Sequence, residues 1–209
     1  MRLTHRRAAG LAAAALAAAL ATTLGAAPVR AAEDPAVAPI KRLYAAFETV
    51  LRNGAGTVKA RVDAVGPTLA ETFDTAAMVP VAVGPKWKGF SPEQQGTLAD
   101  AFGRYFVTTY ANRLSQAAGG KFDIKPESEA KGGNRIVHTH VTSKDGDDSD
   151  VDYVVNARNR AQDVLLNGTV SELASMRASF AEPLKGGADG LLKFMRDRTE
   201  SMLAAKASP

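Results

Sequence analysis

Two histidines have the residue type and spacing best suited to bind a metal ion. His138 and His140 are separated by one residue in a segment rich in Val, Ile and Thr, so a strand would place both on the same face of a sheet. Asp150 or Asp152 on an adjoining strand could complete a ligand set, as in a metal-dependent hydrolase. Two histidines without an assured third ligand are weak evidence, because the solvent face of a strand often carries such residues. The pattern therefore favours a polar sheet face, and we predict no metal ligands.

The acidic segment 145–150 has the composition of a calcium loop but not its spacing. A helix–loop–helix calcium site needs glycine at its sixth position and glutamate at its twelfth. Counted from Asp145, these positions hold Asp150 and Asn156. The segment is instead typical of a solvated turn between two strands.

The sequence contains none of the local motifs that mark common catalytic sites. It has no Gly-x-Ser-x-Gly elbow, no phosphate-binding glycine loop, no His-Glu-x-x-His and no dinucleotide-binding glycine pattern. Cysteine is absent, which excludes thiol nucleophiles, cysteine zinc sites and iron–sulfur clusters. The carboxylates form no evident acid–base pair. We therefore expect a protein that is not an enzyme and that needs no cofactor.

The net charge of +4 comes from the N-terminal segment. Residues 1–32 contain Arg2, Arg6, Arg7 and Arg30 and no acidic residue, and the rest of the chain holds 22 basic and 22 acidic residues. This balance argues against a nucleic-acid-binding protein, which needs a surplus of Lys and Arg to neutralise phosphates. It also argues against a strongly basic helix on a membrane surface.

The same N-terminal segment has the pattern of a secretory signal peptide. Its early arginines precede an apolar stretch, Ala8 to Ala21, that is too short to span a bilayer. Small residues lie after this apolar stretch, and they fit cleavage after Ala27, Ala31 or Ala32. We predict a signal peptide over 1–32 and a single exported domain over 33–209, although an alanine-rich helix that stays attached would show the same composition.

Helical periodicity dominates both ends of the remaining chain. Ser91, Pro92 and Gln94 form the strongest boundary, since serine, proline and glutamine at these positions make a capping box. Gly66-Pro67 should break or kink one helix, and the only tryptophan, Trp87, should lie in a loop over 84–89. The expected helices cover 35–53, 58–73, 92–116, 171–181 and 190–205, and Asp74 should cap a short apolar turn over 75–83.

Between these helices the hydrophobic period changes to two. Segments of alternating apolar and polar residues, or rich in β-branched residues, predict three or four antiparallel strands. The segment 144–149 is typical of a hairpin turn. The expected strands cover 121–127, 135–142, 151–158 and 164–166. Helices, then strands, then helices indicate an α+β fold with helices packed on one face of an antiparallel sheet.

Large apolar side chains from several predicted elements form the candidate ligand pocket. They could leave a cavity between the helices and the sheet, or they could simply fill the core, as such stripes usually do. This candidate lipid-binding set, called the interior set below, contains Phe47, Phe73, Met78, Phe102, Phe106, Tyr110, Val137, Tyr153, Val155 and Met176.

An ordered series of short motifs resembles the MlaC family of periplasmic phospholipid-binding proteins, which includes toluene-tolerance auxiliary proteins. The segment Asn-Gly-Thr-Val-Ser-Glu-Leu-Ala from Asn167 most resembles the hopanoid-associated HpnM branch of the family. The sequence departs from the family pattern at 159–163, where many members carry Gly-x-Trp. The motifs are Asp74-x-x-x-Met78, Val83-Gly84, Trp87, Ser91-Pro92-Glu93-Gln94-Gln95, Phe102, Thr109-Tyr110-Ala111, Asp163-Val164-x-x-Asn167-Gly168-Thr169-Val170-Ser171, Arg177, Phe180 and Gly187-x-Asp189-Gly190-Leu191.

The resemblance implies a monomeric periplasmic carrier whose helices and curved antiparallel sheet enclose an apolar cavity. Such a carrier would shield a phospholipid or a hopanoid and shuttle it between an inner-membrane ABC transporter complex and an outer-membrane lipoprotein complex. The alternative is an envelope structural or interaction domain with a filled core and no ligand. A metal-dependent hydrolase built on His138 and His140 is less favoured.

Overall fold

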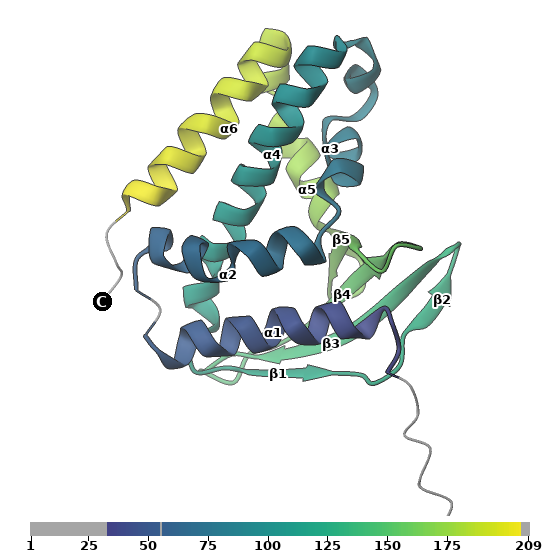
Figure 1. Ribbon diagram of the computed structural model, residues 1–209, viewed down its shortest axis with the longest axis vertical. Helices are drawn as coiled ribbons and strands as arrows, with labels where there is room; N and C mark the ends of the chain where they lie inside the picture. The colour runs from purple at the N-terminus through teal and green to yellow at the C-terminus, as the bar shows by residue number, and fades with distance from the viewer. Residues whose placement is uncertain (1–32, 55, 206–209) are drawn as a thin grey trace, which may run out of the picture. The chain divides into compact units, whose positions relative to one another are not determined.

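The computed structural model describes residues 33–54 and 56–205, which fold into helices and one antiparallel sheet (Figure 1). The predicted signal peptide over 1–32 and its cleavage positions lie outside the described residues. The α-helices are α1 (Val37–Arg52), α2 (Val58–Thr72), α3 (Thr75–Val83), α4 (Pro92–Arg113), α5 (Glu172–Phe180) and α6 (Gly187–Ala204). The strands are β1 (Lys121–Ile124), β2 (Glu129–Lys131), β3 (Asn134–Thr142), β4 (Asp148–Val155), β5 (Ala161–Leu166) and β6 (Val170–Ser171).

Side-chain caps begin α3 and α4 where the sequence predicts them. At the start of α4 the Gln94 amide donates to the Ser91 hydroxyl at 3.2 Å, and the Ser91 amide donates to Gln94 Oε1 at 3.0 Å. At the start of α3 the Ala77 amide donates to the Asp74 carboxylate at 3.2 Å. These bonds satisfy amides that have no partner within a helix, and they fix where each helix begins.

Two local predictions differ from the structure. Helix α2 continues through Gly66 and Pro67 to Thr72, so of the two predicted outcomes, a break or a kink, the break is wrong. A residue before proline normally avoids the helical region because its Cβ clashes with the proline ring, and Gly66 has no Cβ. The segment Gly84–Gly89, expected as a loop, forms a 3₁₀ helix.

The sheet has more strands than the sequence predicts. Its strand order is β1-β3-β4-β5-β6, with β2 also paired to β3, and every pairing is antiparallel. Strand β2 is exposed along its whole length and shows no apolar alternation, which is why it was not predicted. Strand β4 begins at Asp148, inside the predicted turn, because Asp148 pairs with Thr142 of β3. The predicted class, an α+β fold with a curved antiparallel sheet, is confirmed.

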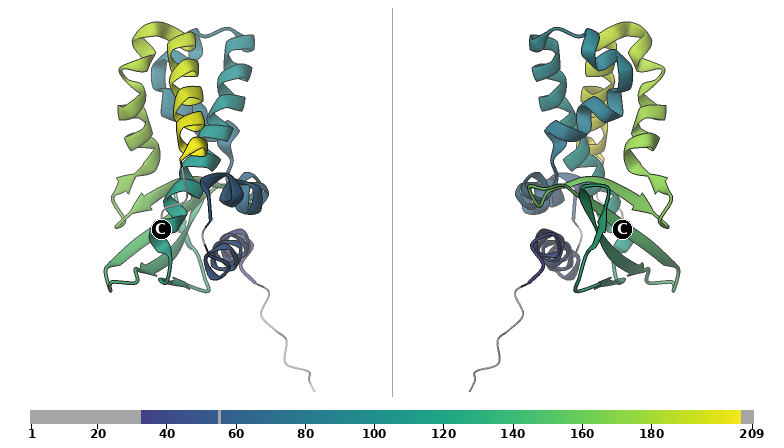
Figure 2. Two further views of the ribbon diagram at one scale, coloured as in Figure 1. Left: turned by 90° about the vertical axis from the view of Figure 1, so that its left-hand side faces the viewer. Right: turned by 90° about the vertical axis from the view of Figure 1, so that its right-hand side faces the viewer.

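The helices divide into two groups by their relation to the sheet. Helix α1 lies along the sheet with α2 next to it, whereas α4, α5 and α6 run away from it (Figures 1 and 2). Val137, Tyr153 and Val155 are buried on the helix-covered side of β3 and β4, and they join one hydrophobic core with residues of α1 to α6. Within residues 33–54 and 56–205, no helix has the length and apolar content needed to cross a membrane.

Candidate functional site

The structure brings the interior set together in one core. Each member is buried except Tyr110, which is half-buried and packs against the others. Phe106 is at the centre, with ring centroids 4.8 Å from Phe73, 4.5 Å from Tyr110 and 6.1 Å from Phe102. Such tilted and edge contacts between rings contribute beyond the apolar area they bury. The interior between helices and sheet is therefore filled with side chains.

Tyrosine hydroxyls within this core are hydrogen-bonded in a chain. Tyr153 donates to the Tyr44 hydroxyl at 3.2 Å, Tyr44 and Thr139 Oγ1 lie 2.7 Å apart, and Thr139 donates to the Val151 carbonyl at 2.5 Å. Burial raises the pKa of Tyr44, Tyr110 and Tyr153, because desolvation disfavours the phenolate. All three are thus neutral hydroxyls, and those of Tyr44 and Tyr153 link α1 to the sheet.

A separate apolar groove lies where α2, α4 and α6 meet. It has a volume of about 520 Å³, and none of the interior set lines it. On α2 every fourth residue lines the groove, and residues of α4 and α6 line it at the same spacing. The groove therefore follows one face of each helix. This groove, called the three-helix groove below, is lined by Val62, Gly66, Ala70, Thr75, Ala99, Asp100, Gly103, Arg104, Val107, Thr108, Thr199 and Leu203.

Small residues keep the three-helix groove open. A Cβ added at Gly103 would meet only Thr75 Oγ1, at 3.7 Å, and one at Gly66 would meet Val107 Cγ1 at 3.5 Å. Both positions therefore have room for a side chain, although glycine inside a helix is unfavourable by about 1 kcal/mol relative to alanine. No motif or large apolar stripe in the sequence marks this site. The spacing of Ala99 and Gly103 on α4, like that of Gly66 and Ala70 on α2, was the available signal.

Helix α4 forms the wall between the interior and the groove. Its residues Phe102, Phe106 and Tyr110 face the core, whereas Ala99, Gly103 and Val107 line the groove. Each set recurs at every fourth residue, so the two sets form adjacent stripes on one helix. A small displacement of α4 would change the volume on both of its sides.

The segment 159–163, where the sequence departs from the family pattern, ties the sheet to α2 and α3. Asn159 has a φ of 56°, which turns the chain so that Arg160 reaches the end of α2. There the Arg160 guanidinium donates to the carbonyls of Ala70, at 2.5 Å, and Phe73. Buried Asp74 accepts from Asn156 at 2.8 Å and from Arg158. The bonds from Arg160 satisfy carbonyls at the C-terminus of α2 that would otherwise lack partners.

The two histidines lie on the sheet face that points away from the helices, and each contacts two carboxylates. His138 Nδ1 is 2.9 Å from Asp152 and its Nε2 is 3.3 Å from Glu129. His140 Nδ1 is 2.9 Å from Asp150 and its Nε2 is 3.2 Å from Asp148. Hydrogen bonds to Asp150 and Asp148 raise the pKa of His140. Within the described ranges, no group of three or more His, Asp or Glu side chains has the arrangement of a metal site.

Comparison with known proteins places this fold in a family. The family model described as MlaC protein matches residues 41–197. A phospholipid-binding protein from Ralstonia solanacearum, solved in complex with a phospholipid, has a similar structure with a TM-score of 0.66. The two sequences are 22% identical, and the match covers 80% of this chain and 98% of the other. No curated protein matches the sequence. Since the family model spans most of the residues from α1 to α6, this chain belongs to the MlaC protein family.

Proposed function

We propose that this protein is a phospholipid-binding carrier that holds an acyl chain in the three-helix groove. The observation that carries the proposal is the groove itself, an apolar hollow of about 520 Å³ kept open by glycine and alanine in a chain of the MlaC family. Pockets that bury small ligands typically have volumes of about 300–1,000 Å³ and mostly apolar walls. The Ralstonia protein, which has the same fold, was solved with a phospholipid.

The groove suits an acyl chain because its apolar walls replace the apolar contacts that the chain loses when it leaves a membrane. Each methylene exposed to water costs about 0.8 kcal/mol, so an unshielded lipid cannot cross an aqueous compartment at a useful rate. Val62, Val107 and Leu203 supply apolar contacts along three different helices. No covalent chemistry is needed for this role, and we propose that the protein is not an enzyme.

The interior set provides the second part of the proposed pocket. Phe102, Phe106 and Tyr110 lie on the stripe of α4 next to the groove, so a shift of α4 would allow a longer or second acyl chain between them. Their rings already form an apolar wall. In this proposal the filled interior is the unloaded state of the pocket, and the Phe73 and Tyr153 rings form its far side.

The cellular role follows from the N-terminal segment and the family. We propose that residues 1–32 are a signal peptide and that 33–209 form one periplasmic domain. This domain would exchange lipid with an inner-membrane ABC transporter complex and an outer-membrane lipoprotein complex as a monomer. The sequence from Asn167 to Ala174 supports membership of the HpnM branch, so we propose a hopanoid as the alternative ligand.

Lipid retention by groove variants tests the proposal. The protein is purified from a bacterial periplasm and its bound lipid is measured by native mass spectrometry. Gly103→Leu should lower lipid occupancy about tenfold while leaving the fold intact, because its side chain fills an apolar pocket of ligand size. Gly96→Leu is the matched control, since Gly96 is on the same helix and a Cβ there meets nothing within 4 Å.

The outcomes separate the candidate functions. Stoichiometric lipid in the wild type and in Gly96→Leu, with loss in Gly103→Leu, supports the carrier. A wild-type protein that never retains lipid would leave the filled interior as a simple core and favour an envelope interaction domain. Lipid retained equally by both variants would place the pocket elsewhere.

A further inference from the structure

A polar hollow continues the three-helix groove at one end. The hollow has a volume of about 470 Å³ and shares Asp100, Arg104, Thr199 and Leu203 with the groove. Apolar residues dominate the lining of the groove, whereas charged and hydroxyl side chains dominate that of the hollow. The two together therefore match an amphiphile, with an apolar tail and a polar head. The hollow is lined by Thr97, Asp100, Ala101, Arg104, Arg196, Thr199, Glu200 and Leu203.

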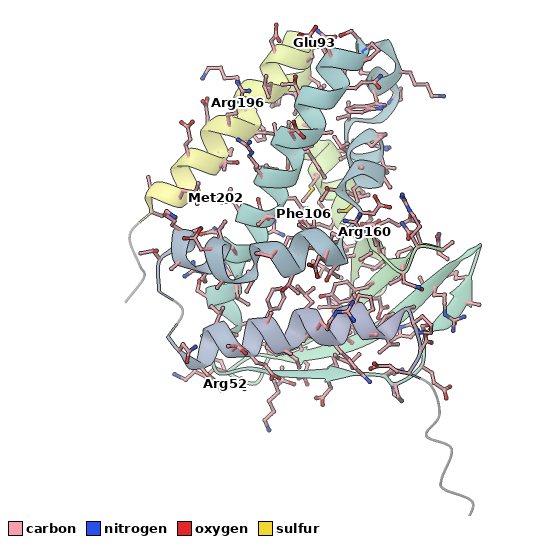
Figure 3. All side chains as sticks on the ribbon, in the orientation of Figure 1. Arg52, Glu93, Phe106, Arg160, Arg196 and Met202 are labelled. Atoms are coloured by element: carbon pink, nitrogen blue, oxygen red, sulfur yellow. The ribbon has the colours of Figure 1, made fainter. Side chains whose placement is uncertain are left out.

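Matching faces of α4 and α6 build this polar hollow. The two helices run side by side in the same direction, and Arg196 lies on α6 several residues before Met202 (Figures 1 and 3). Each contributes residues at i, i+3, i+4 and i+7, which is one face of a helix. Along α4 the acid Asp100 precedes the base Arg104, whereas along α6 the base Arg196 precedes the acid Glu200. Positive and negative groups therefore alternate around the hollow.

These charged groups make no ion pair with one another. Within the described part of the chain, Asp100, Arg104, Arg196 and Glu200 show no side-chain hydrogen bond or ion pair, although each helix spaces its pair at i and i+4. Elsewhere on α6, Lys193 lies 2.5 Å from Asp197, and the hydrogen bond and charge of Asp197 and, more weakly, the charge of Glu200 raise the pKa of Lys193. Arg198 lies over the Phe194 ring at 5.6 Å. The hollow thus presents solvated guanidinium and carboxylate groups that a ligand can contact without breaking an internal salt bridge.

We propose that this hollow binds the headgroup of a zwitterionic phospholipid that carries a primary ammonium. The phosphodiester lies between the guanidiniums of Arg104 and Arg196, the ammonium donates to the carboxylates of Asp100 and Glu200, and an acyl chain enters the groove. The inference rests on the proposed lipid-binding function and specifies its ligand.

The balance of charge in the hollow selects among headgroups. Guanidinium groups are well suited to phosphate, because they offer several N–H donors in a fixed plane. An anionic headgroup such as phosphatidylglycerol would satisfy them but would leave the carboxylates facing a ligand with no positive charge. A primary ammonium offers three donors to these carboxylates, whereas a quaternary ammonium offers none. Quaternary ammonium groups are usually bound by aromatic rings, and the described lining of the hollow contains no aromatic residue.

A competition between lipids with identical acyl chains tests the assignment. The delipidated full-length mature protein is mixed with equimolar dioleoyl phosphatidylethanolamine and dioleoyl phosphatidylglycerol, and both complexes are quantified by native mass spectrometry. The wild type should prefer phosphatidylethanolamine about tenfold, which is the effect of one or two charge-assisted hydrogen bonds. The double variant Asp100→Asn/Glu200→Gln should bind the two lipids about equally. Asp197→Asn, an acid of α6 outside the hollow, should keep the wild-type preference.

The arginines are tested separately, since they contact the group common to both lipids. Arg104→Gln/Arg196→Gln should lower the uptake of both lipids about tenfold, and Arg198→Gln should not. Circular dichroism checks that each variant folds. A wild type that binds both lipids equally would overturn the headgroup assignment and leave the carrier function standing. The same conclusion would follow if Asp100→Asn/Glu200→Gln kept the preference. Failure to bind either lipid would instead overturn the proposed function.

Discussion

The interior and the three-helix groove lie on the two sides of α4 and are built by opposite means. Towards the sheet, α4 contributes Phe102, Phe106 and Tyr110, whose rings interlock with Phe73. Towards α2 and α6, the same helix contributes Ala99 and Gly103. One side is filled by packed rings, and the other is left open by small residues.

This difference separates stability from binding. Large buried rings each remove a large apolar area from water, so the filled interior contributes strongly to the free energy of folding. Glycine and alanine bury little, and glycine weakens the helix that contains it. The small residues of the groove therefore stabilise the protein less than larger apolar side chains at the same positions would. Substitutions on the two sides should change stability in opposite directions.

Truncation on the filled side should have the largest effect. Phe106 is completely buried against three other rings, so Phe106→Ala should lower the free energy of unfolding by about 3–5 kcal/mol. Urea denaturation measures the change. Val81→Ala, at a side chain 47% exposed, should change it by less than about 0.5 kcal/mol. A similar small loss for Phe106→Ala would show that the interior is loosely packed and would remove the contrast with the groove.

The junction between the two regions should show the next largest effect. Asp74 is 1% exposed, caps α3 and accepts from Asn156 and Arg158, so Asp74→Ala removes a cap and leaves the partly buried Asn156 amide without this partner. The expected loss is about 2 kcal/mol, again from urea denaturation. Asp74→Asn keeps an oxygen that can cap α3 and should lose about half as much. Equal losses for the two variants would mean that charge, rather than the cap, dominates.

Local signals predicted much of the fold but not the groove. The capping box at Ser91 and the cap at Asp74 use neighbouring residues, so the starts of α3 and α4 could be identified from the sequence. The interior residues could be named because their size and helical spacing mark a core. Strand β2 and the groove depend on partners far along the chain: β2 pairs with β3, and Gly66, Gly103 and Leu203 meet only in three dimensions. The spacing of glycine and alanine at every fourth residue was the available signal, but these residues lack the large apolar side chains by which the other helix faces were assigned.

A substitution on the open side should raise stability and lower binding. Gly103→Ala places a methyl group 3.7 Å from Thr75 Oγ1, which is an ordinary contact, inside helix α4, which gains helix propensity. The free energy of unfolding should rise by about 0.5–1 kcal/mol, while lipid occupancy falls because the methyl group narrows the groove. Thermal unfolding and native mass spectrometry of the same preparation measure both quantities. A variant that is more stable and binds lipid as the wild type does would show that the groove is not the binding site.

The outer face of the sheet belongs to neither region and should show the smallest effect. His140 is hydrogen-bonded to Asp150 and Asp148, which raise its pKa above 6.5, and Asp123 pairs with it across β1. A raised pKa in the folded state means that the contribution to stability is complete below the unfolded pKa and is lost as the pH rises through the folded value. Because His140 is exposed to solvent, this contribution should be small.

Titration of His140 by NMR therefore compares this face with the groove. The midpoint should lie above 6.5 in the wild type and fall in Asp150→Asn, and Asp145→Asn, in the adjoining turn, should leave it unchanged. Saturating lipid should not move the midpoint, since His140 does not line the groove. A shift on lipid addition would mean that loading the groove changes the sheet, so that α4 transmits the movement through the filled interior. A midpoint at or below 6.5 would show instead that water, rather than Asp150, solvates the imidazolium.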